Sequence, residues 1–392
     1  MRASQKFPLT ILGAVMGVSI GNMFYSQSLL PVISSAFDLP SGRVGVVPVM
    51  LQVGLLTSLV FLLPAGDLLD RRKMLRLIAC GASLSAFSIV LSGDFSLLLV
   101  AFYGLGFCSL SSYILPAFVS GLVGPHERGF VIGRLLSGQF AGILLSRLFS
   151  GLMAHWFGWR SIYLMSAVLM GGVALLWPRL IPPDTESVNE PYALVISRQF
   201  SLFRRFDVLR QACASQGFQF AAFIVVWTGL SLRLANPPWS FGPAQIGAFG
   251  LVGLASITSA AWVGRMVDRF GARQVITGCS GMTLLGVIGL IVWDTSVVAI
   301  LVSMCCIDFG VQGSYVANQS RVLSLDLAAR SRLGALLFIS AFGAAAVSGL
   351  LLVRLWPIWG WHGVLYLALG LVLLAMLSQC SGLTIARPSP SS

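Results

Sequence analysis

Two short charged segments decide how this chain is organised: GDLLDRRK at residues 66–73 and GRMVDRFGAR at residues 264–273. Each of them ends a long apolar stretch. Their first glycines are 198 positions apart, and so are Asp70 and Asp268, in a chain of 392 residues. The chain is therefore close to two copies of one unit, with charged clusters between apolar spans. This arrangement predicts a membrane protein with two lobes.

The composition excludes a water-soluble globular protein. Hydrophobic residues make up 57% of the chain and charged residues 10%, whereas soluble domains have about 45–50% and about 25%. Twelve apolar runs come close to the roughly 20 residues that a spanning helix needs. We expect helices because backbone polar groups in hydrocarbon must be satisfied within their own segment. The runs are 8–34, 44–65, 74–92, 95–123, 129–155, 160–181, 210–234, 243–263, 274–293, 296–321, 333–355 and 362–382.

The positive charges are distributed unevenly between the two sides of the membrane. If the N-terminus is cytoplasmic, twenty of the 25 Lys and Arg residues face the cytoplasm. Only Arg43, Arg160, Arg233 and Arg354 face the other side, and Arg147 lies within a span. This positive-inside bias predicts a multi-pass protein of the inner (plasma) membrane with both termini in the cytoplasm. Because the basic residues act as topological signals, we expect the lipid bilayer and no nucleic acid as a partner.

The longest polar segment divides the spans six and six. It covers residues 182–209, so the sequence predicts an N-terminal lobe at 1–181, a cytoplasmic linker at 182–209 and a C-terminal lobe at 210–392. Part of the linker, near 193–206, is expected to form an amphipathic helix on the membrane surface. A second repeat supports the duplication, since GWRSIY at 158–163 and GWHGVLY at 360–366 open the sixth and twelfth spans.

A doubled Gly-x-x-x-Asp-Arg cluster on twelve spans resembles the major facilitator superfamily. The signature of that family, Gly-x-x-x-Asp-Arg-x-Gly-Arg-Arg/Lys, joins the second and third helices of each lobe. The second copy matches it at Gly264, Asp268, Arg269, Gly271 and Arg273. The first copy keeps Gly66, Asp70, Arg71 and Lys73, with Arg72 where a turn glycine is usual. The resemblance implies an all-α fold of two pseudo-symmetric six-helix lobes, and it implies that these residues form a conformational latch on the cytoplasmic side.

Within the superfamily, the chain is similar to exporters of the drug/H⁺ antiporter type. Those proteins carry a Gly/Pro-rich motif in the fifth helix. This chain has Gly133, Gly138, Gly142 and Gly151 there, together with Arg147. The stretch contains no proline and departs from the pattern in that respect, but its small residues still allow close helix contact.

Asp308 is the most informative single residue, because it lies at the centre of the tenth span. A charge at that depth costs about 2.5–3.5 kcal/mol on insertion scales, which favours a functional role. Gln312, Tyr315 and Gln319 follow it on the same helix face. Burial favours the protonated form of a carboxylic acid, so Asp308 is a candidate for proton coupling or substrate contact. The alternative is a structural acid that bonds to a neighbouring helix.

Other spans also carry polar or aromatic residues at mid-depth. The resemblance implies that spans one, four, seven and ten line the central cavity, which suits a medium-sized amphipathic ligand; ordinary helix packing is the alternative. The candidates outside the tenth span are Asn22, Tyr25, Tyr113, Gln216, Gln219 and Trp227.

Arg147, deep in the fifth span, is a possible anion contact. It could also pair with an acid or extend outward to the membrane surface. Pairing with Asp308 would need both side chains to reach across lobes and about 8 Å of depth.

These features predict a secondary active transporter that moves a small molecule by alternating access between two lobes, through proton-coupled export. The alternative within transport is a facilitator or a substrate/H⁺ symporter for a small metabolite. The alternative from another class is a non-transporting membrane receptor or sensor. We do not expect an enzyme, since no Ser/His/Asp set, metal cluster or phosphate loop is recognisable. We expect no cofactor and no metal, and we expect a monomer.

Overall fold

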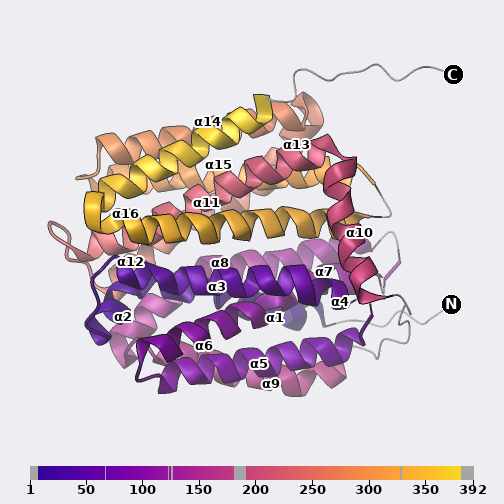
Figure 1. Cartoon of the computed structure of the whole chain (residues 1–392), viewed down its shortest axis with the longest axis horizontal. Helices are drawn as coiled ribbons and strands as arrows, with labels where there is room; N and C mark the ends of the chain where they lie inside the picture. The colour runs from indigo at the N-terminus through magenta and orange to yellow at the C-terminus, as the bar shows by residue number, and fades with distance from the viewer. Residues whose placement is uncertain are drawn as a thin grey trace.

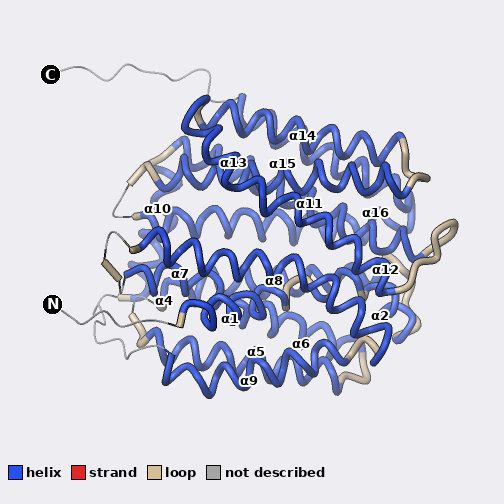
Figure 2. The backbone as a smooth tube through the Cα atoms, turned by 180° about the vertical axis from the view of Figure 1, so that it is seen from behind, coloured by secondary structure: helices blue, strands red, loops and turns tan. Residues whose placement is uncertain are grey.

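The computed structural model describes residues 8–66, 68–121, 123–124, 127–180, 191–326 and 329–380. Within these ranges the chain is helical apart from short connections, and no strand occurs (Figure 2). The helices lie side by side in one bundle (Figure 1), with the first half of the chain in the lower part of that view and the second half in the upper part. The fold is therefore an all-α membrane fold with two six-helix lobes.

The N-terminal lobe holds the first six spans. Three of them bend where short 3₁₀ or π segments interrupt the α-helix, and three are continuous. Its elements are α1 (Leu9–Gly21), η1 (Tyr25–Ser28), α2 (Leu30–Ala36), η2 (Arg43–Gly45), α3 (Val46–Thr57), η3 (Ser58–Leu62), α4 (Leu63–Ala65), α5 (Arg71–Leu91), α6 (Phe95–Phe107), η4 (Cys108–Leu110), α7 (Ser111–Gly121), α8 (Arg128–Phe157) and α9 (Ser161–Leu180).

The C-terminal lobe holds the other six spans. Its elements are α11 (Asp207–Ala235), α12 (Pro243–Ala248), η5 (Phe249–Gly253), α13 (Leu254–Phe270), α14 (Ala272–Val292), α15 (Val297–Leu323) and α16 (Arg330–Cys380). The last of these contains two spans, because Gly360 adopts φ +54° and ψ −135° and breaks the helix.

The helices account for all twelve predicted spans. Nine helices of the described residues are long and apolar enough to cross a membrane singly, and one of these is the double-length α16. The first span is assembled from α1 and α2, and the eighth from α12 and α13.

Helix ends are capped locally. Asp94 precedes α6 and accepts hydrogen bonds from the Ser96 and Leu97 amides at 2.8 and 3.2 Å. These hydrogen bonds lower the pKa of the Asp94 carboxyl.

The two lobes repeat one tertiary contact. Arg72 donates from Nη2 to the Pro178 carbonyl, and Arg273 donates from Nη2 to the Gln379 carbonyl at 2.9 Å. Both contacts join residues 106 positions apart, and each ties the third helix of a lobe to the end of its sixth. The two arginines are 201 positions apart, whereas Asp70 and Asp268 are 198 apart. The difference arises because α5 begins directly after its cap Asp70, whereas α13 continues past Asp268 to Phe270 before the chain turns. The structure thus adds a physical basis to the sequence repeat.

The helix predicted within the linker is present as α10 (Tyr192–Arg205). It crosses one end of the bundle and spans both lobes (Figure 1). Tyr192 donates from its hydroxyl to the Phe61 carbonyl in the N-terminal lobe, while Leu202 packs with Leu209 and Leu333 in the C-terminal lobe. The predicted linker residues 182–190 lie outside the described residues. We call this end of the bundle the α10 end and the opposite one the far end.

Glycines allow α1 and α8 to cross at backbone contact. A Cβ atom on Gly138 would lie 2.2 Å from the Gly13 carbonyl oxygen, and one on Gly142 would lie 2.2 Å from the Gly17 carbonyl oxygen. Small residues spaced by four on both helices are typical of close packing between membrane helices. This crossing holds the first span against the fifth.

We therefore expect Gly142→Leu to destabilise the protein by at least the roughly 1–3 kcal/mol of an overpacked core, because backbone cannot move aside as a side chain can. Gly133→Leu is the matched control, since no atom of another element lies within 4 Å of a Cβ at that position of α8. Thermal unfolding of the detergent-solubilised protein measures both. Equal melting temperatures for the two variants would contradict the crossing.

Candidate functional site

A large cavity lies between the two lobes. Its volume is about 1220 Å³, and it is lined by residues of both lobes and of α10. At the α10 end the wall includes Gly66, Ser324 and Arg330, of which Ser324 and Arg330 are exposed. The cavity is therefore open at the α10 end.

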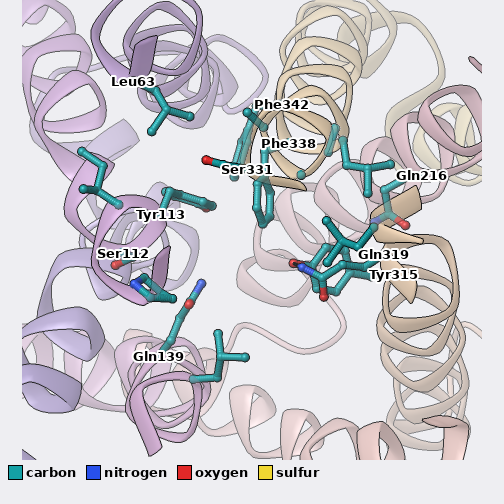
Figure 3. A pocket seen from close by; sticks show the side chains of 18 of the residues that line it. Leu63, Ser112, Tyr113, Gln139, Gln216, Tyr315, Gln319, Ser331, Phe338 and Phe342 are labelled. Atoms are coloured by element: carbon teal, nitrogen blue, oxygen red, sulfur yellow. Dashed lines mark hydrogen bonds between the residues drawn. The ribbon is translucent and has the colours of Figure 1, made fainter. Parts of the chain in front are cut away.

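Aromatic side chains form the middle of the cavity wall. Tyr113 of α7 meets Phe338 of α16 edge-on with ring centroids 4.6 Å apart, and Phe342 at 6.0 Å. Tyr315 of α15 lies against the other side of Phe338 at 5.7 Å. Figure 3 shows that these rings come from opposite sides of the cavity and meet across it. The wall is thus a continuous apolar surface that joins the lobes.

Five predicted cavity residues line this cavity: Tyr113, Gln216, Gln312, Tyr315 and Gln319. Gln319 donates from Nε2 to the Tyr315 hydroxyl at 2.9 Å. Gln216 is 3% exposed, and its Oε1 has no hydrogen-bond partner. The polar stripe of the tenth span faces the cavity with all its members except Asp308.

Three other candidates are placed inside their own lobes instead of at the cavity. Asn22 accepts a hydrogen bond from the Ser166 hydroxyl, Tyr25 packs edge-on against Tyr163 at 6.3 Å, and Gln219 donates to the Ser280 hydroxyl at 2.6 Å. These three side chains bond or pack within their lobes and do not line the cavity. Polarity at mid-depth cannot distinguish a side chain bonded within its lobe from one that faces the cavity.

Sequence reasoning missed several cavity residues. Gln139 lies on α8 and Gln199 on α10, and both line the cavity. Gln199 is 3% exposed, and its Nε2 has no partner. Gln139 is a polar residue in an apolar run, which was an available signal. Nothing in the linker sequence indicated that Gln199 would face a cavity.

The far end is closed by backbone contact between the lobes. A Cβ atom on Gly247 of α12 would lie 2.5 Å from the Arg147 carbonyl oxygen, and one on Gly151 of α8 would lie 2.4 Å from the Pro243 carbonyl oxygen. A Cβ on Gly250 would lie 2.8 Å from the Arg147 Cβ. Because α8 belongs to one lobe and α12 to the other, the described backbones of the two lobes meet there. We call it the far-end contact.

Arg147 lies buried at the far-end contact, with 2% of its surface exposed. Its Nε donates to Gln27 Oε1 at 2.7 Å, and its guanidinium lies 4.0 Å from the Trp227 ring centroid. The Phe24 and Phe223 rings surround the same group at 5.1 and 5.6 Å. Stacking on aromatic faces suits the planar guanidinium. An arginine of the N-terminal lobe thus lies between Phe24 of its own lobe and two aromatic residues of the C-terminal lobe, Phe223 and Trp227.

Asp308 lies close to both Trp227 and Arg147. It is 3% exposed, and its Oδ2 has no hydrogen-bond partner. Its carboxylate is near enough to the Arg147 guanidinium to interact with it electrostatically, but the two side chains form no direct ion pair in the described structure. The approach of the two lobes thus brings together two charges that lie on different spans.

The cavity and this charged pair adjoin each other. Phe24 and Phe223 line the cavity and also flank the Arg147 guanidinium. Phe24 and Phe223 therefore belong both to the cavity wall and to the group of rings around Arg147. A ligand that touches these two rings from the cavity would act directly on the far-end contact.

The two predicted latch segments lie at the α10 end. Asp70 accepts hydrogen bonds from the Arg72 and Lys73 amides at 3.0 and 3.3 Å, and Arg71 donates from Nε to the Gly66 carbonyl at 3.0 Å. In the second copy, Gly271 turns the chain with φ +83°, and Asp268 and Arg269 are exposed.

Comparison with known proteins gives a consistent result. The sequence profile of the Major Facilitator Superfamily matches residues 11–331. The transporter YgaY of Escherichia coli is 30% identical over 361 residues, which cover 91% of this chain and 90% of that protein. A "Probable sugar efflux transporter" of Pasteurella multocida is 25% identical over 260 residues, 60% of this chain and 64% of that one.

Among solved structures, the nucleoside transporter NupG superposes with a TM-score of 0.76 at 11% sequence identity, covering 95% of this chain and 99% of that one. This likeness shows the fold. Transport is not an enzymatic reaction, and the helical fold, the open cavity and the profile match agree with one another. The chain belongs to the major facilitator superfamily and is a membrane transporter.

Proposed function

We propose that this protein is a proton-coupled exporter that carries small amphipathic molecules out of the cytoplasm by alternating access. In this proposal the α10 end and both termini face the cytoplasm of the inner membrane, as the positive-inside bias favours. The rocking units are the lobes at 1–181 and 210–392, and the structure is the inward-open state. The likeness to a probable sugar efflux transporter supports export.

The observation that carries the proposal is that two buried groups of opposite charge, Arg147 and Asp308, both lie beside Trp227. A charged pair removed from water interacts more strongly than one at a surface. When Asp308 is ionised, its attraction to Arg147 stabilises the far-end contact and holds the transporter open to the cytoplasm. When Asp308 is protonated, that attraction is lost and the far end can open.

A substrate could act on the same contact from inside the cavity. It would press on Phe24 and Phe223, which enclose the Arg147 guanidinium. Either a proton or a substrate would then release the lobes, whereas the empty, ionised transporter would stay closed at the far end. This is the condition for exchange, because a carrier that could return empty would dissipate the proton gradient.

The charged segments at 66–73 and 264–273 suit a role in the other half of the transport cycle, in which the α10 end is closed. With the cavity open at the α10 end, Asp268 and Arg269 are exposed, as residues of a released latch would be. We propose that the two segments engage when this end closes. Helix termini such as the one at Asp70 supply partial charges for that engagement.

Transport in proteoliposomes tests the proposal. The purified protein is reconstituted with a pH-sensitive dye inside, and a labelled aromatic compound is offered with and without a gradient of one pH unit. We expect substrate and protons to move in opposite directions and up to about tenfold accumulation per proton exchanged, because one pH unit supplies about 1.4 kcal/mol. Movement in the same direction would indicate symport, and equal uptake with and without the gradient would contradict proton coupling.

A further inference from the structure

The charged residues that line the cavity are all of one sign. Arg71, Arg330 and Arg332 line it at the α10 end, and no acidic side chain lines it among the described residues. The α10 end as a whole carries both signs, since Asp70 and Asp326 also lie there. A topological signal alone would not explain why arginines face the cavity and acids do not.

Two of these arginines stand at a defined distance from the aromatic wall. Phe338 follows Arg332 by six residues of α16, which is a rise of about 9 Å. Arg330 donates from Nε to the Leu323 carbonyl at 3.1 Å, which holds its guanidinium at the mouth. A ligand whose ring lies on Phe338 and whose acidic group lies one to two ring lengths away would reach both surfaces.

Unpartnered amides mark polar positions in the same cavity. Gln216 Oε1 and Gln199 Nε2 are buried, lack hydrogen-bond partners and belong to side chains that line the cavity. Buried polar groups normally have hydrogen-bond partners, so a ligand with polar atoms would supply the partners that these two amides lack. Gln199 comes from α10, which would make the linker helix part of the binding site.

We infer that the substrate is an aromatic organic anion. Its ring packs on the wall formed by Tyr113, Phe338 and Tyr315, and its acidic group faces Arg330 and Arg332. This inference rests on the proposed transport role of the cavity and adds the chemical class of the substrate.

The charge distribution also excludes the opposite class. An organic cation would leave water for a cavity whose described lining offers no carboxylate, and an unpaired charge in such a place is costly. Asp308 does not serve that role, because it is absent from the lining and faces Trp227. A neutral compound would keep the aromatic contacts but gain nothing from the arginines.

Binding to the purified full-length protein in lipid nanodiscs tests this inference without any gradient. The probes are three naphthalene derivatives that share one ring system: 2-naphthylacetate, 2-naphthylacetamide and 2-naphthylethylammonium. Titration calorimetry measures each. We expect the acetate to bind at least tenfold more tightly than the amide and the ammonium compound to bind most weakly, with the preference for the acetate shrinking at high salt.

A paired substitution locates the effect. Arg330→Gln with Arg332→Gln should weaken acetate binding about tenfold and change amide binding less than twofold. The matched control, Arg204→Gln with Arg265→Gln, removes two exposed arginines from the same end that do not line the cavity, and should leave both affinities unchanged. Size-exclusion chromatography confirms that each variant is folded.

Three results would overturn the inference: tightest binding by the ammonium compound, no binding by any of the three, or equal loss of acetate affinity in the control pair. None of them bears on Asp308, so failure here is distinguishable from failure of proton coupling. A transporter that passes the pH-gradient assay with another substrate but shows no preference for the acetate would retain the proposed function and lose only the substrate class.

Discussion

Asp308→Asn is expected to abolish gradient-driven accumulation in proteoliposomes while leaving the protein folded. The amide has nearly the shape of the protonated acid but cannot release a proton. The attraction to Arg147 is then absent throughout the cycle. Accumulation at one pH unit should fall from up to about tenfold to equilibrium, because no proton movement remains to drive it.

The measurement is uptake of the labelled substrate with and without the gradient, in parallel with proton movement. Asp294→Asn is the matched control, since Asp294 lies at the far end in an ion pair with Arg233 at 3.7 Å and outside the cavity. It should retain accumulation. If Asp308→Asn accumulated substrate as the wild type does, the proton site would have to be another group.

Gly247→Leu is expected to reverse the conformational preference of the transporter. The Cβ position of Gly247 lies 2.5 Å from the Arg147 carbonyl oxygen, so a leucine cannot be accommodated while the far end is closed. Separation of α8 from α12 relieves that clash and corresponds to opening of the far end. Overpacking of this kind costs roughly 1–3 kcal/mol, which shifts a two-state equilibrium by about 5- to 150-fold.

Cysteine accessibility measures this shift in a background that lacks the native cysteines. Ser28→Cys reports on the far end, because Ser28 is 2% exposed and lines a small pocket there with Arg147 of its own lobe and Trp227 of the C-terminal lobe. Ser331→Cys reports on the α10 end, where Ser331 is exposed and lines the cavity. In Gly247→Leu, labelling at 28 by an impermeant maleimide should rise at least about fivefold and labelling at 331 should fall.

Gly278→Leu serves as the matched glycine control, since no atom of another element lies within 4 Å of its Cβ position. Its two labelling rates should stay at the wild-type values. Increased labelling at both ends of Gly247→Leu would indicate general loosening of the protein, and unchanged labelling would show that the far-end contact does not set the state.

Much of the fold was predictable from the sequence because the bilayer constrains it strongly. Apolar runs of about 20 residues can only be helices there, so twelve spans followed from length and composition. The doubled charged segment gave two lobes, and Arg72 and Arg273 now show the repeat as equivalent contacts in space. The surface helix in the linker followed from amphipathicity, which depends only on local spacing.

The candidate site was only partly predictable. A polar stripe in a membrane helix must face something other than lipid, and Gln312, Tyr315 and Gln319 of the tenth span line the cavity. The same reasoning placed Asn22 and Gln219 at the cavity, although both bond within their lobes.

The sequence by itself determined the membrane environment, the helical class, the twelve spans and their duplication, since each depends on hydropathy, charge or repetition along one chain. Only the tertiary structure decided which end is open, which polar residues face the cavity, and that Arg147 and Asp308 both lie beside Trp227. These depend on the rotation of each helix and the approach of two lobes. Contacts between residues 80 or more positions apart fix both, and the hydropathy of a single span does not encode them.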